Sequence, residues 1–235
     1  MTGGPRPGSG RVRVEARRVR RRPAAVPGGA PPRYGPAVRD YYEQLWERLP
    51  GDLRPPDLEL RERFALAHVA AGDRVLDLGC GEGDLAARIA AAGASVTGAE
   101  VADAALRRAR ARHPELALRL VEIEAALPFE DGAFDVVWSS EVIEHVADTE
   151  RWLSEARRVL APRGRLLLTT PSHGRLRLLI GGMERFSEPL GDHLHLYTAR
   201  SLRRLLEEFE FGDVRVRTAG GPPLLRRLLL ASAVR

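Results

Sequence analysis

The stretch VLDLGCGEGDLAARIA at residues 75–90 decides the fold. An apolar run enters three closely spaced glycines, Gly79, Gly81 and Gly83, and a helical segment opens at about Asp84. Glycines permit a tight turn and let a ligand lie against bare backbone, and the free N–H groups of a helix N-terminus face the same point. The stretch therefore predicts a strand, a ligand-binding turn and a helix.

A carboxylate ends the next predicted strand. Glu100 closes residues 94–100 and lies seventeen residues after Gly83. A carboxylate at the tip of a neighbouring strand can accept both hydroxyl hydrogens of a ribose. The turn and the carboxylate together predict a nucleoside-binding half-site at the carboxyl edge of a parallel sheet. The alternative is that the glycines form only a turn and that Glu100 is a solvated strand end.

The glycine spacing distinguishes between nucleosides. A dinucleotide fingerprint reads G-x-G-x-x-G, and here Asp84 stands where its third glycine belongs. A carboxylate there repels a pyrophosphate, which argues against a nicotinamide dehydrogenase. The acidic loop, with Asp77, Glu82 and Asp84, suits a ligand with positive charge. S-adenosylmethionine carries a sulfonium and an ammonium and has no phosphate.

Apolar strands alternate with helical segments along most of the chain. This alternation, with strands apolar on both faces, predicts an α/β fold, a Rossmann-like, doubly wound and mostly parallel sheet with helices on both faces. The predicted strands are 74–79, 94–100, 117–123, 133–139, 165–171 and 213–218. The predicted helices are 37–49, 57–71, 84–92, 103–112, 149–160 and 199–209, with a short helical turn at 141–145.

Composition limits the class of protein. Of 235 residues 44% are apolar and 29% are charged, so the chain can build a full core, and no apolar run approaches the ~20 residues of a membrane span. The single cysteine, Cys80, excludes a disulfide framework and a cysteine-built zinc site. No apolar segment follows the arginine-rich N-terminus, so we expect no secretory signal and a cytoplasmic location.

Residues 1–33 differ from the rest of the chain. They hold nine arginines and one glutamate together with glycine and proline, so we expect a disordered tail. It is interpreted as a solvated leader, an electrostatic arm, a transit peptide or the product of a misplaced start codon. Residues 34–235 hold 28 arginines against 31 acidic residues. A slightly acidic domain argues against nucleic acid as the partner.

Four motifs in order resemble the class I S-adenosylmethionine-dependent methyltransferases, most closely the broad group that includes the ubiquinone-biosynthesis O-methyltransferases. The motifs are VLDLGCGEG at 75–83, Glu100, LPFEDGAFDVVWSSEVIEHV at 127–146 and RVLAPRGRLLLTTPS at 158–172. The resemblance covers about residues 60–218. It implies the strand order 3-2-1-4-5-7-6, with the cofactor over strands 1, 2 and 4.

The expected domain limits follow from the resemblance and the composition. Family members usually end on a strand hairpin, and only one of its strands, 213–218, is clear here; the apolar stretch 224–235 is interpreted as a last strand or helix, or as a weak surface anchor. The expected parts are a tail at 1–33 and a methyltransferase domain at 34–235, divided into N-terminal helices at 34–71, a cofactor-binding core at 72–172, an acceptor lid at 173–197, and a C-terminal helix and sheet edge at 198–235.

The resemblance also implies the cofactor contacts. Asp77 and the glycine turn line the methionine part, Glu100 holds the ribose, and Ser139 lies under the methionine part. An acid at the end of strand three holds the adenine amino group, and Glu122 with Ile123 beside it fits that place; if the alignment slips by one, Ile123 occupies it and the polar contact is lost. The implied cofactor-binding residues are Asp77, Gly79, Cys80, Gly81, Gly83, Glu100, Val101, Glu122, Ile123 and Ser139.

A carboxylate–histidine cluster follows strand four. Glu141, Glu144 and His145 stand at i, i+3 and i+4, which on a helix places all three on one face. Three interpretations remain open: His145 acts as a general base or orients the substrate, with Glu141 beside it; the group holds a divalent metal such as Mg²⁺; or it only caps the loop. In the metal case, resemblance to small-RNA 2′-O-methyltransferases makes His193 the further ligand.

The cluster bears on the acceptor. A hydroxyl needs a base or a metal in addition to alignment, so the cluster favours a small-molecule hydroxyl acceptor. The alternatives are a metal-dependent RNA 2′-O-methyltransferase and a non-catalytic nucleoside-binding relative. The apolar stretch 174–190 is interpreted as a mobile lid, and Tyr41, Tyr42 and Trp46 either cover the substrate or pack on the sheet. The remaining histidines, read as ordinary surface or loop residues, are His68, His113 and His173.

Overall fold

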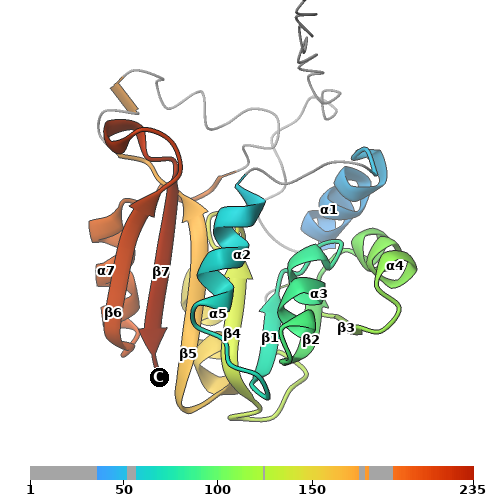
Figure 1. The fold of residues 1–235 in the computed structure, drawn as a ribbon. Helices are drawn as coiled ribbons and strands as arrows, with labels where there is room; N and C mark the ends of the chain where they lie inside the picture. The colour runs from blue at the N-terminus through green and yellow to red at the C-terminus, as the bar shows by residue number, and fades with distance from the viewer. Residues whose placement is uncertain (1–35, 52–56, 124, 175–177, 180–192) are drawn as a thin grey trace, which may run out of the picture.

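One sheet organises the molecule. The computed structural model describes residues 36–51, 57–123, 125–174, 178–179 and 193–235. In these residues seven strands form a sheet in the order β3-β2-β1-β4-β5-β7-β6, with helices on both faces (Figure 1). This confirms the predicted fold class and strand order. The strands are β1 (Arg74–Leu78), β2 (Ser95–Glu100), β3 (Ala117–Leu120), β4 (Phe134–Ser140), β5 (Leu160–Pro171), β6 (Gly212–Ala219) and β7 (Leu228–Val234).

The helices cover two apolar cores. On one face Phe64 and Ile89 pack against Val136 and Trp138; on the other, Leu153 packs in a cluster with the C-terminal helix and the hairpin. Phe64 is 3% exposed and the other four are fully buried, so both faces of the central strands exclude water. The helices are α1 (Pro36–Arg48), α2 (Leu58–Leu66), α3 (Asp84–Ala91), α4 (Asp103–Arg112), α5 (Thr149–Val159) and α7 (Ala199–Glu208), with a 3₁₀ turn η2 (Pro223–Leu225).

The parallel part of the sheet sets where a site can form. β1 pairs in parallel with both β2 and β4, and β4 pairs in parallel with β5. The carboxyl ends of these strands therefore meet at one edge, and the loops that follow them lie together. In open α/β sheets, ligands bind in the crevice at this edge.

The C-terminal hairpin is complete. β7 pairs antiparallel with β5 on one side and with β6 on the other, so the stretch 224–235 supplies the last strand, as the first of its interpretations held. Arg227 holds the hairpin tip against the start of α2 by two hydrogen bonds of 2.7 Å to Asp57. Those bonds and the charge of Arg227 keep the pKa of Asp57 below its ordinary value.

Some element boundaries differ from the prediction. β3 ends at Leu120 and not at 123, and α2 ends at Leu66 and not at 71. β5 begins at Leu160, five residues early, because the Ala-Pro-Arg-Gly stretch joins the strand; Arg163 adopts a φ of 67° there. Leu160 and Arg165 pair with β4 on either side of residues 161–164, where the register between the two strands shifts.

Two further expectations meet the limits of the described residues. The tail at 1–33 lies outside them, and so does most of the expected lid at 173–197, of which 173–174, 178–179 and 193–197 are described. Within the described part, no helix combines the length and apolar character that a membrane crossing requires.

Leu167→Ala tests the central packing. Leu167 lies on β5 and is fully buried, so its truncation leaves a cavity and lowers the free energy of unfolding by about 2–5 kcal/mol. Urea denaturation measures the change. Leu179→Ala is the control, because Leu179 is 83% exposed; a loss at Leu167 no larger than at Leu179 would contradict the packing described.

Candidate functional site

The glycine turn joins β1 to α3 as predicted. Gly79, Gly81 and Gly83 have φ values of 84°, 54° and 79°, a left-handed conformation that favours glycine. The free faces of the first two glycines are covered by protein: a Cβ at Gly79 would collide with Val142, and one at Gly81 would lie 3.0 Å from the Trp46 ring. Bare backbone at this turn thus makes room for these two side chains.

Glu100 is bound to the turn that precedes α3. Its Oε2 accepts a 2.9 Å hydrogen bond from the N–H of Gly81, and its Oε1 accepts bonds from the N–H groups of Val101 and Ala102 at 2.8 and 3.2 Å. The carboxylate is buried. Burial raises the pKa of Glu100 above its ordinary value, and the three N–H donors oppose that shift.

Asp77 is the second buried acid at this point. It is 2% exposed on β1, and burial followed by the nearby charge of Glu100 raises the pKa of Asp77 to about 8. Two buried carboxyl groups with mutual repulsion favour a ligand that brings positive charge or hydroxyl donors. This pair, Asp77 and Glu100, is called the acid pair below.

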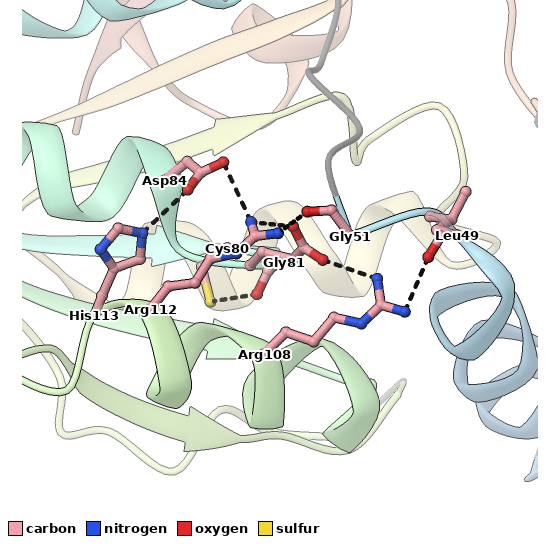
Figure 2. Close-up of polar contacts among 9 residues, drawn as sticks. Leu49, Gly51, Cys80, Gly81, Asp84, Arg108, Arg112 and His113 are labelled. Atoms are coloured by element: carbon pink, nitrogen blue, oxygen red, sulfur yellow. Dashed lines mark hydrogen bonds and ion pairs between the residues drawn. The ribbon is translucent and has the colours of Figure 1, made fainter.

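The other two acids of the loop do not face a ligand. Glu82 binds Arg108 at 3.0 Å and also Arg112, and Asp84 contacts His113 Nε2 at 3.0 Å (Figure 2). All three partners come from α4 or directly after it. The expectation that the whole acidic loop attracts a cation is therefore wrong for Glu82 and Asp84. Attraction of a cationic ligand to this place would depend on the acid pair.

The remaining expected cofactor residues lie along the same edge. Glu122 is 66% exposed at its side chain and pairs with Arg39 of α1 at 2.9 Å, and Ile123 beside it is half-buried. Ser139 is buried and donates a 2.6 Å hydrogen bond to the carbonyl of Leu78. Cys80 lies against β2, where a Cβ at Gly98 would come within 2.8 Å of its sulfur.

The segment at 141–145 is a turn and not a helix. Glu141 has a φ of 58°, and its N–H donates to the carbonyl of Thr169 at 2.9 Å, which prolongs the ladder between β4 and β5. Its Oε1 accepts a 3.2 Å hydrogen bond from the hydroxyl of Thr169. Helical spacing therefore does not place Glu141, Glu144 and His145 on one face.

Glu144 gathers the other members of the cluster. Donor atoms of Glu144, His145 and His193 all lie within 4.8 Å of one another, and Glu141 is not among them. The N–H groups of Leu194 and His195 donate to the carbonyl of Glu144 at 2.8 and 3.1 Å, which brings His193 beside the turn. Two imidazoles and one carboxylate form a donor set that fits zinc, iron or manganese better than Mg²⁺.

The Glu144 side chain is fully buried. Its Oε2 accepts a 2.9 Å hydrogen bond from Thr170, and its Oε1 lies 3.8 Å from Nε2 of His145. Burial, and then the charge of Glu141, raises the pKa of Glu144 to about 8. A carboxylate in this position is stabilised when His145 carries a proton.

Three histidines were expected to be ordinary surface or loop residues, and His173 departs from this. It is 1% exposed, and its ring lies 5.8 Å from that of His193. It follows directly after the carboxyl end of β5, a position that marks functional residues in parallel sheets and would have identified it. His113 contacts Asp84, and His68 Nδ1 lies 2.9 Å from the carbonyl of Phe64.

Sequence reasoning missed a buried arginine. Arg61 on α2 is 5% exposed and donates to the hydroxyl of Ser140 at 3.1 Å, which in turn lies 2.8 Å from the Thr169 hydroxyl. Its charge opposes the rise in the pKa of Glu141 that burial causes. No local pattern predicts this contact, because 79 positions separate Arg61 from Ser140.

A family model described as a methyltransferase domain matches residues 41–216, about three quarters of the chain. The 27-O-demethylrifamycin SV methyltransferase of Amycolatopsis mediterranei is 38% identical over 148 residues, which are 56% of this chain and 54% of that protein. The ubiquinone biosynthesis O-methyltransferase of Albidiferax ferrireducens is 37% identical over 134 residues, 53% of each chain. The chain thus spans about half the length of these curated relatives.

Solved structures share the fold. The S-adenosylmethionine-dependent methyltransferase from Mesorhizobium loti superposes with a TM-score of 0.62 at 22% identity, over 76% of this chain and 97% of that chain. At this identity the likeness concerns the fold alone.

Glu100→Ala tests the predicted ribose contact. Removal of the carboxylate takes away the acceptor of the Gly81 N–H, so we expect S-adenosylhomocysteine affinity to fall at least about tenfold. Calorimetric titration measures the affinity. The same measurement on Glu122→Ala shows the effect of removing the exposed acid that follows β3. Undiminished affinity in Glu100→Ala would remove this residue from the site.

Asp77→Asn tests the buried acid through pH. The folded pKa of Asp77 is about 8, above the unfolded value near 4, so the folded state holds a proton that the unfolded state releases. Stability of the cofactor-free protein therefore falls as pH rises from about 4 to 8. We expect Asp77→Asn to reduce this loss and to be more stable than the wild type at pH 8 by about 1 kcal/mol or more. The free energy of unfolding of both proteins is measured by denaturation at several pH values, and an equal change with pH in the two proteins would contradict the prediction.

Proposed function

The chain belongs to the methyltransferase-domain family, and we propose that it transfers a methyl group from S-adenosylmethionine to a hydroxyl of a small molecule. The observation that carries this proposal is that the turn bearing Glu144 and His145 lies against the glycine turn, since a Cβ at Gly79 would collide with Val142. β1 pairs with β4 in the register Asp77↔Trp138, so the turn that follows β4 stands at the same edge as the cofactor turn.

The acid pair supports the choice of cofactor. Asp77 and Glu100 are buried acids beside a turn that opens α3, and the family's cofactor carries an ammonium, a sulfonium and ribose hydroxyls. The names of the two relatives above both describe methyl transfer, and both refer to an oxygen acceptor. These names support an oxygen acceptor here without identifying it.

The proposed reaction is an in-line displacement. The acceptor oxygen forms a bond to the methyl carbon while the bond between carbon and sulfur breaks, which leaves S-adenosylhomocysteine. The hydroxyl proton passes to His145, whose side chain is 20% exposed. Glu144, 3.8 Å away, stabilises the imidazolium, in the way that a buried carboxylate supports a histidine base.

A metal would use the same side chains. Glu144, His145 and His193 would hold it, and a divalent ion supplies a lowered hydroxyl pKa at the acceptor. Such an ion and a histidine base are alternatives at this place, because a ligating His145 nitrogen cannot also take the proton. The chelator arm of the experiment below separates them.

A screen of methyl acceptors with labelled S-adenosylmethionine tests the proposal. Small molecules with aromatic or aliphatic hydroxyls and a structured RNA are tested in parallel, each with and without EDTA. We expect label in a hydroxyl compound; label in the RNA alone would favour the RNA 2′-O-methyltransferase, and no transfer with intact cofactor binding would favour a non-catalytic relative. Loss of transfer in EDTA, restored by added metal, would assign the cluster to a metal.

His145→Ala tests the base. We expect kcat to fall by about 10²–10⁴-fold while S-adenosylhomocysteine affinity changes little, because His145 lies outside the acid pair. His68→Ala is the matched control, since its described contacts are with Phe64. A kcat for His145→Ala equal to that of the control would exclude the proposed proton transfer.

A further inference from the structure

Helix α1 lies across the cofactor edge of the sheet (Figure 1). Two of its contacts lie at opposite ends of the site expected for the cofactor. Arg39 pairs with Glu122, the residue expected at the adenine. Near the other end, the Trp46 ring lies 3.0 Å from the position of a Cβ on Gly81, in the turn expected to hold the methionine part.

Between these ends α1 caps α4. The N-cap position of α4 is Ala102, which has no side-chain acceptor. The carboxylate of Glu43 takes that place, because it accepts the N–H groups of Asp103 and Ala104 at 2.7 and 2.8 Å. A carboxylate there satisfies free helix N–H groups and the helix dipole. The middle of α1 is thus fixed to the start of α4, three residues after Glu100 in the sequence.

The C-terminal end of α1 is tied to the glycine turn by two arginines of α4 (Figure 2). Arg108 donates to the carbonyl of Leu49 at 2.9 Å and to Glu82 at 3.0 Å. Arg112 donates to Glu82 and to the carbonyl of Gly51. Glu82 is the shared partner and is itself 9% exposed. The pair Arg108–Arg112 with Glu82 is called the arginine clamp.

Charged contacts contribute to holding α1 in place. Among the described side chains of the helix, residues 38–48, none is buried. Ion pairs and hydrogen bonds join the helix to its neighbours through Arg39, Glu43 and the arginine clamp. An element with few buried apolar contacts opens at lower free energy than the sheet below it.

We propose that Trp46 is a cofactor-contacting residue, and that Arg108 and Arg112 are positioning residues that hold α1 over the bound S-adenosylmethionine through Glu82. The cofactor then leaves only when α1 lifts from the edge. This inference rests on the cofactor of the family and not on the nature of the acceptor.

Displacement kinetics test it on the full chain. The protein is loaded with labelled S-adenosylmethionine, excess unlabelled cofactor is added, and the release rate is followed; calorimetry with S-adenosylhomocysteine gives the affinity. Loss of two charge-assisted contacts in Arg108→Gln/Arg112→Gln is expected to raise the release rate roughly tenfold or more. Trp46→Ala is expected to raise it likewise, and Trp46→Phe to restore most of the retention.

Arg110→Gln is the matched control. Arg110 lies on the same helix, and its side chain pairs with Asp103 at 3.4 Å, so its replacement removes one arginine charge from α4 and leaves the clamp intact. A triple variant with Glu82→Gln added to the double variant avoids a buried carboxylate without partners. It should release the cofactor as fast as the double variant while its far-ultraviolet circular dichroism matches the wild type.

The outcomes separate the parts of the proposal. An unchanged release rate in Trp46→Ala would overturn the assignment of Trp46, and unchanged rates in the double and triple variants would overturn the clamp. A rise in Arg110→Gln equal to that of the double variant would also overturn the clamp. Failure of the wild type to bind any cofactor would contradict the family's cofactor, whereas normal binding without any acceptor would leave this proposal standing and contradict only the proposed reaction.

Discussion

The hydrogen bond from the Gly81 N–H to Glu100 joins the two strands on which the site depends. It joins the glycine turn after β1 to the tip of β2. The same carboxylate receives the N–H groups that lead into α4. One buried side chain thus connects the turn before α3 with the start of α4.

The packed sheet and the loops at its carboxyl edge are held by different kinds of contact. The sheet and the helices on its faces exclude water through leucine, valine and alanine packing. Several side chains near the carboxyl edge of the sheet are held by polar contacts: Arg61 through Ser140, Glu144 through Thr170, and Glu82 through α4. Segments held mainly by polar contacts open at a lower free energy than the packed sheet that positions them.

Local pattern predicted most of the elements and the place of Glu100 at the end of a strand, because apolar periodicity and glycine spacing involve residues that are close in the sequence. The strand order was an implication of the family resemblance. Local pattern failed where a contact joins distant positions. Glu141 leaves the helical pattern because its N–H continues the ladder to Thr169, and Glu82 is neutralised by arginines 26 and 30 positions away. The spacing of Glu141, Glu144 and His145 was real, but the turn that carries them has another geometry.

Cys80, the single cysteine of the chain, stands in the glycine turn. Burial, followed by the negative charges of Asp77 and Glu100, raises the pKa of its thiol. Because the thiolate is the reactive form, we expect this sulfur to react slowly with maleimides and peroxides. A cysteine introduced on an exposed face would therefore accept a fluorophore or a spin label selectively, and the chain needs no cysteine-free background for such labelling.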